Sequence, residues 1–495
     1  MDKNTIILLC VGTYMLLCIA IGLWAMRRTK NTGDFFMAGR NLGVIVTGVA
    51  IFSSTMSGFG FVGGPGLIYR MGMSSFWMII TTPISFCIAY YLLAKRVRLI
   101  SELGNCVSLP DVAAARYGSQ SVRLLVAIAI LAGVVPYLAT QIKAMALVLQ
   151  RLLAANGMPG HESLLLCVIV SSAVLVFYCT TGGIIASVYS DLFQGVVMVV
   201  VAILVFFSAL STVDGGIPEI TRVIAADDTE AISPWGTIGM LGCLSWFFMF
   251  TFGAAGQPHL VTKMMMARRV EDARASLPIT LVGFGMTALL WISIGLVMRT
   301  LVLSGQHEPL ARADDAAFVF LNDYAHPVLA GLAFAGLFAA VMSTADGFLN
   351  IGAAAIVHDI HQAMFDRPLK NELLWARVAT VALAVFAAIC AMVSPDLVAL
   401  LGAYGWGVFA AALAPCIAFG LNWKRATPAA AIVSILVSLA INGVAFGFQL
   451  AEQRLSYGVS PGTVALLASL LTFFAVSMLS SPREIDSDVD AVLDI

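Results

Sequence analysis

The sequence predicts an all-α protein that crosses a membrane many times. Of its 495 residues, 60% are hydrophobic and only 11% are charged, whereas about a quarter of the residues in a soluble protein are charged. Apolar runs near the ~20 residues that a helix needs to cross a bilayer recur along nearly the whole chain. No stretch is long and polar enough for a separate soluble domain, so we expect one membrane transport domain over residues 1–495.

The apolar runs predict about thirteen transmembrane helices. They cover 5–26, 43–69, 72–94, 122–150, 163–181, 184–211, 235–256, 275–302, 327–357, 374–394, 397–421, 427–449 and 462–480. No small-residue cleavage site follows the first run, so we interpret it as a membrane helix rather than a signal peptide. The nine cysteines lie singly and without a CxxC spacing, which favours small hydrophobic side chains over disulfides or a metal site.

The distribution of basic residues predicts how the chain is oriented. With the N-terminus outside, nineteen lysines and arginines, Lys263 among them, fall in cytoplasmic segments. Seven fall outside, and Lys143 lies inside a span. This asymmetry fits the positive-inside rule. We therefore expect an external N-terminus, a cytoplasmic C-terminus and a plasma membrane location, and the lack of an Asn-x-Ser/Thr sequon favours a bacterial inner membrane.

Two spans contain residues that suit a continuous helix poorly. The second carries "SSTMSGFG" (Ser53 to Gly60), and the seventh carries "TFGAAGQPH" (Thr251 to His259). They lie five spans apart, and matching breaks in two halves of a chain are typical of inverted-repeat transporters. Unwound backbone is tolerated at membrane depth only where it is buried in protein or lines a watery cavity. We expect its free carbonyls to hold a cation and a substrate; the alternative is that the small residues only let helices pack closely.

The ninth span places polar side chains in an otherwise apolar helix. Its sequence "AAVMSTADGFLN" contains Ser343, Thr344 and Asp346. Adjacent hydroxyls, together with carbonyls from a broken helix, make a hard-oxygen site that suits a small cation such as Na⁺. The alternative is that both hydroxyls bond back to carbonyls one turn earlier in their own helix.

Six motifs follow one another along roughly residues 5–425. They are "TKNTGDFFMAGRNLG" (Thr29 to Gly43), "TMSG" (Thr55 to Gly58), "ARYG" (Ala115 to Gly118), "TTGGIIASVYSDLFQG" (Thr180 to Gly195), "GQPH" (Gly256 to His259) and "AAVMSTAD" (Ala339 to Asp346). In this order they resemble the solute/sodium symporter family, and most closely its sodium/proline branch. The resemblance implies a core of two five-helix inverted repeats. These repeats would cover about 43–211 and 235–421, with 5–26, 427–449 and 462–480 as extra helices.

The resemblance also implies a Na⁺ site between the second and ninth spans. Its ligands would be the backbone carbonyls of Ser53, Met56 and Ala340 and the hydroxyls of Ser343 and Thr344. The proline branch usually has Asp where this chain has Thr55. Losing that carboxylate should weaken the attraction for a cation or move the charge elsewhere. Asp191, where the family keeps an acid near the inner end of the sixth span, is the candidate for the sodium path or a second cation site.

The substrate pocket that the resemblance implies lies beside the breaks. Its residues would be Ser57, Gly58, Tyr137, Phe250, Ala254 and Pro258. The proline branch presents Trp and Tyr where this chain has Phe250 and Ala254. Replacing an aromatic residue by Ala enlarges the pocket and removes a hydroxyl. We therefore expect that a bulkier amino acid or another small carboxylate fits this pocket better than proline itself.

Helical periodicity adds one residue to the pocket and leaves another out. At about 100° per residue, Gln141 shares the helix face of Tyr137, whereas Lys143 points to another side. We expect Gln141 in the pocket, with a packed interhelical hydrogen bond as the alternative. Lys143 is expected to extend outward or to pair with an acid on a neighbouring helix.

The sequence therefore predicts a Na⁺-coupled symporter that imports a small organic solute, an amino acid such as proline or a bulkier relative. One alternative is Na⁺-coupled uptake of a monocarboxylate or other small organic acid. Another is a proton-coupled transporter of the same fold, with Asp191 or Asp346 as the proton carrier. The spans contain no clustered catalytic groups, so no enzyme is expected. A net charge of −1 gives no indication of nucleic acid, and no obligate protein partner is evident.

Overall fold

The computed structural model describes residues 2–155, 157, 163–393, 398–450 and 459–495. In these ranges the regular structure is helical, apart from one isolated bridge between Leu42 and Ala267. Eleven helical stretches in them are long and apolar enough to cross a membrane. The prediction of an all-α, multi-pass membrane protein is therefore confirmed.

Twenty-two α-helices are found in the described residues. They are α1 (Lys3–Met26), α2 (Thr32–Met37), α3 (Val44–Thr55), α4 (Gly64–Met71), α5 (Phe76–Ala89), α6 (Lys95–Leu103), α7 (Leu109–Tyr117), α8 (Gln120–Ala155), α9 (Leu164–Leu210), α10 (Gly216–Asp227), α11 (Gly239–Gly253), α12 (Pro258–Met265), α13 (Val270–Ala275), α14 (Leu277–Leu303), α15 (Ala316–Asp323), α16 (Pro327–Ala354), α17 (His361–Phe365), α18 (Glu372–Val393), α19 (Val398–Leu413), α20 (Pro428–Leu450), α21 (Pro461–Leu479) and α22 (Ser487–Leu493). Short turns of tighter or wider helix join several of them.

The predicted spans overlap these helices, and two of them fall in α9. The chain bends within α9 at Gly183, which has a φ of 54° and a ψ of −144°. This bend falls between the predicted spans 163–181 and 184–211. The span ends predicted at 394 and 397 lie outside the described residues. The total of thirteen spans and the inverted repeat remain predictions.

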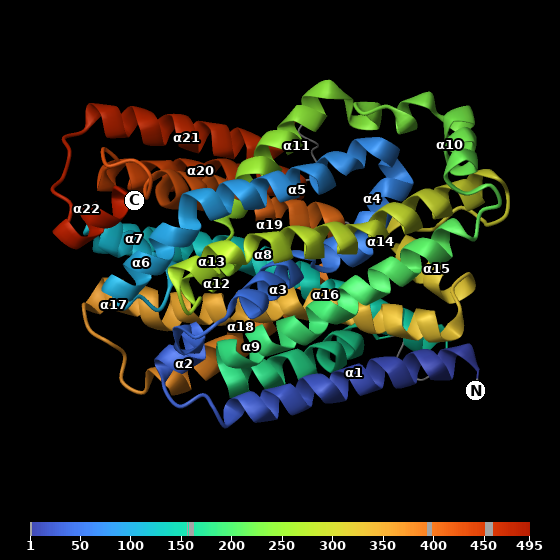
Figure 1. The fold of residues 1–495 in the computed structure, drawn as a ribbon, viewed down its shortest axis with the longest axis horizontal. Helices are drawn as coiled ribbons and strands as arrows, with labels where there is room; N and C mark the ends of the chain where they lie inside the picture. Colours follow the sequence, from blue (N-terminus) through green and yellow to red (C-terminus); the bar gives the residue numbers. More distant parts are fainter. Residues whose placement is uncertain (1, 156, 158–162, 394–397, 451–458) are drawn as a thin grey trace.

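The long helices lie alongside one another, with α1 along one edge of the bundle and α21 along another (Figure 1). The two termini lie at opposite ends of the long axis, and α6, α7, α17 and α22 gather at the end that holds the C-terminus. The centre is formed by α16, in which every residue from Ala333 to Ala354 is buried. It packs against α1, α3, α8 and α9. Polar groups on this helix are therefore enclosed by protein.

Both predicted helix breaks are present. α3 ends at Thr55, Met56 has a non-helical φ of −79° and ψ of 78°, and a wide turn over Phe59–Gly63 leads into α4. α11 ends at Gly253, and Gln257 is extended, with a φ of −77° and a ψ of 109°, before α12 begins at Pro258. Proline suits the first turn of a helix because the N–H that it lacks has no partner there.

We predict that Gly183→Ala destabilises the protein. The backbone at Gly183 is in a region that side chains other than glycine rarely enter, at a cost of about 1–3 kcal/mol. A Cβ there would also lie 2.5 Å from Cδ2 of Phe35. Thermal unfolding in detergent should show a clear drop in Tm. The control is Gly285→Ala on the exposed side of α14, where a Cβ meets nothing within 4 Å; equal Tm values for the two variants would contradict the prediction.

Candidate functional site

The hydroxyls of Ser343 and Thr344 in α16 face the broken end of α3. Ser343 Oγ donates to the carbonyl of Ser53 at 2.9 Å, and Thr344 Oγ1 donates to the carbonyl of Ser54 at 2.8 Å. Both hydroxyls also lie near the carbonyl of Ala340 in their own helix, at 3.1 and 3.3 Å. Each hydroxyl therefore lies near a carbonyl of α3 and also near a carbonyl of its own helix, so both arrangements considered in the sequence analysis are present. Five oxygen atoms from two helices meet at this point, and the carbonyl of Ser54 is one that the sequence analysis did not predict.

The residues next to this cluster contribute no carboxylate. Met56 is fully buried at the non-helical position where α3 ends. Thr55 uses its hydroxyl to bond back to the carbonyl of Ile51 at 2.8 Å. The cluster thus consists of neutral hydroxyl and carbonyl oxygens, a donor set that fits a hard cation such as Na⁺.

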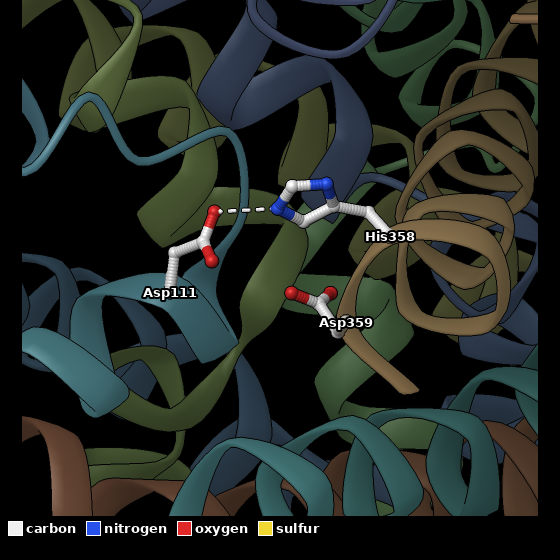
Figure 2. A group of neighbouring side chains, drawn as sticks. All are labelled: Asp111, His358 and Asp359. Carbon is white, nitrogen blue, oxygen red and sulfur yellow. Dashed lines mark hydrogen bonds and ion pairs between the residues drawn. The ribbon is translucent and has the colours of Figure 1, made fainter. Parts of the chain in front are cut away.

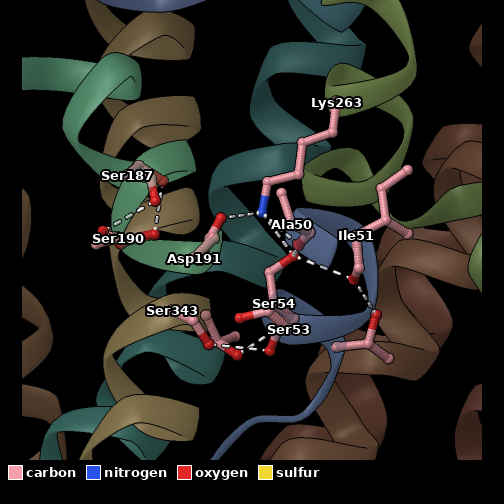
Figure 3. Close-up of polar contacts among 12 residues, drawn as sticks. Ala50, Ile51, Ser53, Ser54, Ser187, Ser190, Asp191, Lys263 and Ser343 are labelled. Carbon is pink, nitrogen blue, oxygen red and sulfur yellow. Dashed lines mark hydrogen bonds and ion pairs between the residues drawn. The ribbon is translucent and has the colours of Figure 1, made fainter. Parts of the chain in front are cut away.

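Lys263, which the sequence analysis counted among the basic residues of the cytoplasmic segments, is buried in α12. Its side chain is 1% exposed and its ion-pair partner Asp191 is 0% exposed. The Lys263 Nζ atom donates to Asp191 Oδ2 at 2.7 Å, to Ser54 Oγ at 2.7 Å and to the carbonyl of Ala50 at 2.9 Å (Figure 3). The physical reason is that α12 begins inside the protein at Pro258 and packs against α3, so its second turn is still buried.

Polar residues on α9 face the same region. Ser187, Ser190, Asp191 and Gln194 are spaced i, i+3, i+4 and i+7 and therefore lie on one face of the helix. This spacing was a signal in the sequence, but only Asp191 was singled out from it. Lys263 had a weaker signal, since it stands one helical turn after the histidine of "GQPH".

Asp346 in α16 is the second fully buried carboxylate near the break. Its Oδ1 accepts a hydrogen bond from Ser187 Oγ at 2.7 Å. Its Oδ2 accepts one from the Tyr178 hydroxyl at 2.8 Å and a longer one from Ser190 Oγ at 3.4 Å. All three donors come from α9, so Asp346 ties α16 to that helix.

The residues predicted for the substrate pocket meet on the other side of the α3 break. The hydroxyls of Ser57 and Tyr137 are 3.4 Å apart, and the N–H of Gly58 donates to Gln141 Oε1 at 2.8 Å. A Cβ on Gly58 would lie only 3.0 Å from Ala144 Cβ, so the absence of a side chain lets α3 and α8 approach each other here. The structure thus brings together the four pocket residues that the sequence analysis took from these two helices.

The seventh-span residues lie beside the same break. The ring centroid of Phe250 is 6.5 Å from that of Phe59 and 5.6 Å from that of Trp406. The N–H of Ala254 donates to Ser85 Oγ at 2.9 Å. Ser85 and Trp406 were not predicted, and no local signal in the sequence could have found them, because they belong to α5 and α19.

The remaining lysine that the sequence analysis singled out lies apart from these contacts. Lys143 in α8 is 8% exposed, and it does have an interaction partner. Pro258 is fully enclosed as the first residue of α12.

A charged cluster joins three helices at the end of the bundle that holds the C-terminus. His358 lies in the helical turn that continues α16. Its Nε2 is 3.0 Å from Asp111 Oδ2, and its Nδ1 is 2.7 Å from Glu372 Oε1; Asp359 lies next to the ring (Figure 2). Burial raises the pKa of Asp111, but the hydrogen bond and charge of His358 and the charge of Arg123 outweigh it and bring the pKa below its ordinary value. The cluster is an ion-pair network that holds α7, α16 and α18 together.

The fold and the site define the class of the protein. Two broken helices that bring free carbonyls, hydroxyls and buried charges together inside a multi-pass helical bundle are the architecture of a secondary transporter. A sequence model of the sodium:solute symporter family matches residues 35–438, and the chain belongs to that family. It is accordingly a membrane transporter rather than an enzyme, and sodium is its coupling ion.

Comparison with known proteins agrees with this assignment. The chain is 28% identical over 478 residues to the high-affinity proline transporter PutP of Bacillus subtilis (strain 168), covering 93% of this chain and 96% of that protein. It is 24% identical over 510 residues to the sodium/proline symporter of Staphylococcus aureus (strain NCTC 8325 / PS 47), covering 100% and 97%.

Solved structures show the same fold. A Na⁺-coupled sialic acid symporter superimposes with a TM-score of 0.79 at 19% identity, over 98% of this chain and 100% of that one. Mhp1, a nucleobase-cation-symport-1 family transporter, gives a TM-score of 0.56 at 14% identity, over 93% and 98%.

We predict that breaking the Lys263–Asp191 ion pair by removing one partner strongly destabilises the protein. Lys263→Met leaves the Asp191 carboxylate buried without its cation, which should cost about 3–5 kcal/mol. The double variant Lys263→Met with Asp191→Asn removes both charges and should recover much of the loss. Thermal unfolding of the two single variants and the double variant forms a double-mutant cycle. The control is Arg222→Met, whose pair with Glu219 is exposed to water and should contribute little to stability; a Lys263 variant no less stable than this control would refute the prediction.

Proposed function

We propose that this chain imports a small amino acid, proline or a bulkier relative, driven by Na⁺ bound between α3 and α16. One observation carries the proposal: the same break in α3 supplies both sites. Ser53 and Ser54 present their carbonyls to the α16 hydroxyls, and Ser57 and Gly58, only a few residues on, contact the α8 side of the pocket. An ion that orders this segment therefore also orders the pocket.

In this mechanism Na⁺ binds the carbonyls of Ser53, Met56 and Ala340 and the hydroxyls of Ser343 and Thr344. The two hydroxyl hydrogens would rotate away so that their oxygens face the ion. With α3 held against α16, substrate affinity rises, and by linkage the substrate raises Na⁺ affinity by the same factor. The occupied core then opens to the inside.

Asp191 would act beside the path by which Na⁺ leaves. One of its oxygens is held by Lys263, while its Oδ1 has no hydrogen-bond donor among the described atoms. This free oxygen supports a role for Asp191 in cation passage. The membrane potential, about 2.3 kcal/mol per charge per 100 mV, favours inward movement of the ion.

We also propose an external N-terminus and a cytoplasmic C-terminus in a bacterial inner membrane. The termini lie at opposite ends of the bundle (Figure 1), as an odd number of crossings requires. Without the buried Lys263, the predicted cytoplasmic segments still carry eighteen basic residues, against seven in the predicted external segments. The two sequence relatives named above come from bacteria, Bacillus subtilis and Staphylococcus aureus.

Proline leads the candidate substrates because the names of both relatives specify it. The pocket supports a larger solute as well. Phe250 lacks a polar group, and Ala254 contributes only a methyl group beside it. The second candidate is therefore a bulkier amino acid, followed by a small monocarboxylate.

We predict that Ser343→Ala weakens Na⁺-dependent substrate binding at least about tenfold. A hydroxyl ligand to an ion is worth about 1.5–3 kcal/mol, and each 1.4 kcal/mol is a factor of ten. Labelled proline would be bound to purified protein in NaCl and in choline chloride. The control is Ser434→Ala in α20, a buried serine whose hydroxyl only bonds back to Ala431. Equal binding in the two salts would refute sodium coupling of this site.

We predict that Ala254→Tyr shifts selectivity toward small solutes. The added ring would fill space beside Phe250 and restore the aromatic residue that the proline branch has here. Competition of unlabelled amino acids and monocarboxylates against a bound labelled solute should show the largest accepted competitor losing about tenfold relative to proline. Should proline fail to bind wild type in either salt, the same panel identifies the solute. An unchanged order of competitors in the variant would show that position 254 does not line the pocket.

A further inference from the structure

The charged cluster at the C-terminal end of the bundle contains three side chains that suit a metal ion. Asp111 stands in the first turn of α7, and His358 and Asp359 stand in the wide turn Ala355–Ile360 that continues α16. One imidazole nitrogen and two carboxylate oxygens from these residues all lie within 4.8 Å of one another. Figure 2 shows both carboxylates turned toward the His358 ring. An imidazole with two carboxylates is a donor set that suits a divalent transition metal.

Asp359 has a feature that ion pairing alone does not explain. Its side chain is 0% exposed, and its Oδ2 atom has no hydrogen-bond donor among the described atoms. Its other oxygen, Oδ1, accepts a hydrogen bond from the hydroxyl of Ser108. A buried carboxylate oxygen without a donor is costly in free energy. A cation held beside Asp111 and His358 would give this oxygen a partner.

A second layer of residues orients these three side chains. His358 Nδ1 lies 2.7 Å from Glu372 Oε1, which directs the other ring nitrogen, Nε2, at Asp111. Asp111 Oδ1 pairs with Arg123 Nη2 at 2.9 Å. Metal-binding histidines usually donate their second N–H to a carboxylate or a carbonyl, and metal-binding carboxylates are themselves hydrogen-bonded. The cluster therefore has the outer contacts of a metal site as well as its ligands.

The charge of the cluster matches a divalent cation. Three carboxylates and one guanidinium are in contact around the ring: Asp111, Asp359, Glu372 and Arg123. With His358 neutral, these groups leave two negative charges. The His358 side chain is 19% exposed, so an ion can reach Nε2 from the water at this end of the bundle. When the ion binds there, the Nε2 proton is released to water and Nδ1–H remains on Glu372.

We propose that Asp111, His358 and Asp359 form a binding site for one divalent transition-metal cation, with water in its remaining coordination positions. The bound cation clamps α7 to the end of α16 and, through the contact of His358 with Glu372, to α18. None of these residues belongs to the oxygen cluster at the α3 break or to the proposed substrate pocket. The inference therefore goes beyond the proposed function and does not rest on it.

The test is a titration of the purified full-length protein, without a histidine tag, with Mn²⁺. Free Mn²⁺ is measured by electron paramagnetic resonance. Mn²⁺ prefers oxygen and nitrogen ligands, so the free cysteines should not compete for it. Wild type should bind one Mn²⁺ per chain, and Asp359→Asn and His358→Gln should each bind it at least about tenfold more weakly. Zn²⁺ should displace Mn²⁺, whereas Mg²⁺ at the same concentration should not, because it prefers ligands that are all oxygen.

Two controls separate metal binding from folding. His361→Gln changes the neighbouring histidine, whose Nδ1 faces the carbonyl of Arg367, and should bind Mn²⁺ as wild type does. Thermal unfolding in EDTA shows which variants are folded, and added Mn²⁺ should raise the Tm of wild type and His361→Gln but not that of Asp359→Asn. Either ligand variant decides the question if the other does not fold. Wild-type affinity in a folded ligand variant, displacement of Mn²⁺ by Mg²⁺, or a wild type that binds neither Mn²⁺ nor Zn²⁺ overturns the proposal.

Discussion

Backbone groups released by a break inside a membrane need partners within the protein, because lipid offers none. At the end of α3 the released carbonyls bond to hydroxyls of α16, and the N–H of Gly58 bonds to Gln141 of α8. The carbonyl of Ala50 bonds to Lys263 of α12. The break in α11 follows the same rule, since the N–H of Ala254 bonds to Ser85 of α5. Two short stretches of backbone therefore need hydrogen-bond partners from other helices, which explains why these helices converge. The carbonyl and hydroxyl oxygens that form these bonds are also the kind of oxygen that a cation needs.

Charge imposes a second constraint on the same region. A buried ion pair contributes little net stability but is costly to break, because the remaining partner stays charged without water. Lys263 and Asp191 neutralise each other's charge, and their contacts join α12, α9 and α3. Thr55, where related symporters of the proline branch have Asp, adds no charge. The buried negative charges near the break therefore lie on α9 and α16, at Asp191 and Asp346, and not on α3.

The fold by itself does not determine which solute is carried. The sialic acid symporter superimposes on nearly all of this chain although only 19% of the residues are identical. A fold does not specify a substrate; the residues of the site do. In the pocket that we propose, the differences from the proline branch are Phe250, whose ring lies near those of Phe59 and Trp406, and Ala254. Under that proposal, changes at these two positions would alter the pocket and leave in place the oxygens of α3 and α16 proposed for the cation.

The sequence by itself determined the all-α membrane fold, both breaks and the hydroxyl pair Ser343 and Thr344. Each depends on a local property: the length of an apolar run, glycine and proline at membrane depth, or two adjacent polar residues in an apolar helix. Only the tertiary structure decided the partners. Lys263 follows an apolar run and therefore looks like a loop residue, until packing of α12 against α3 buries it beside Asp191. Helical periodicity tells which face a side chain occupies, but not which distant helix lies opposite, because that choice depends on how all the helices pack together.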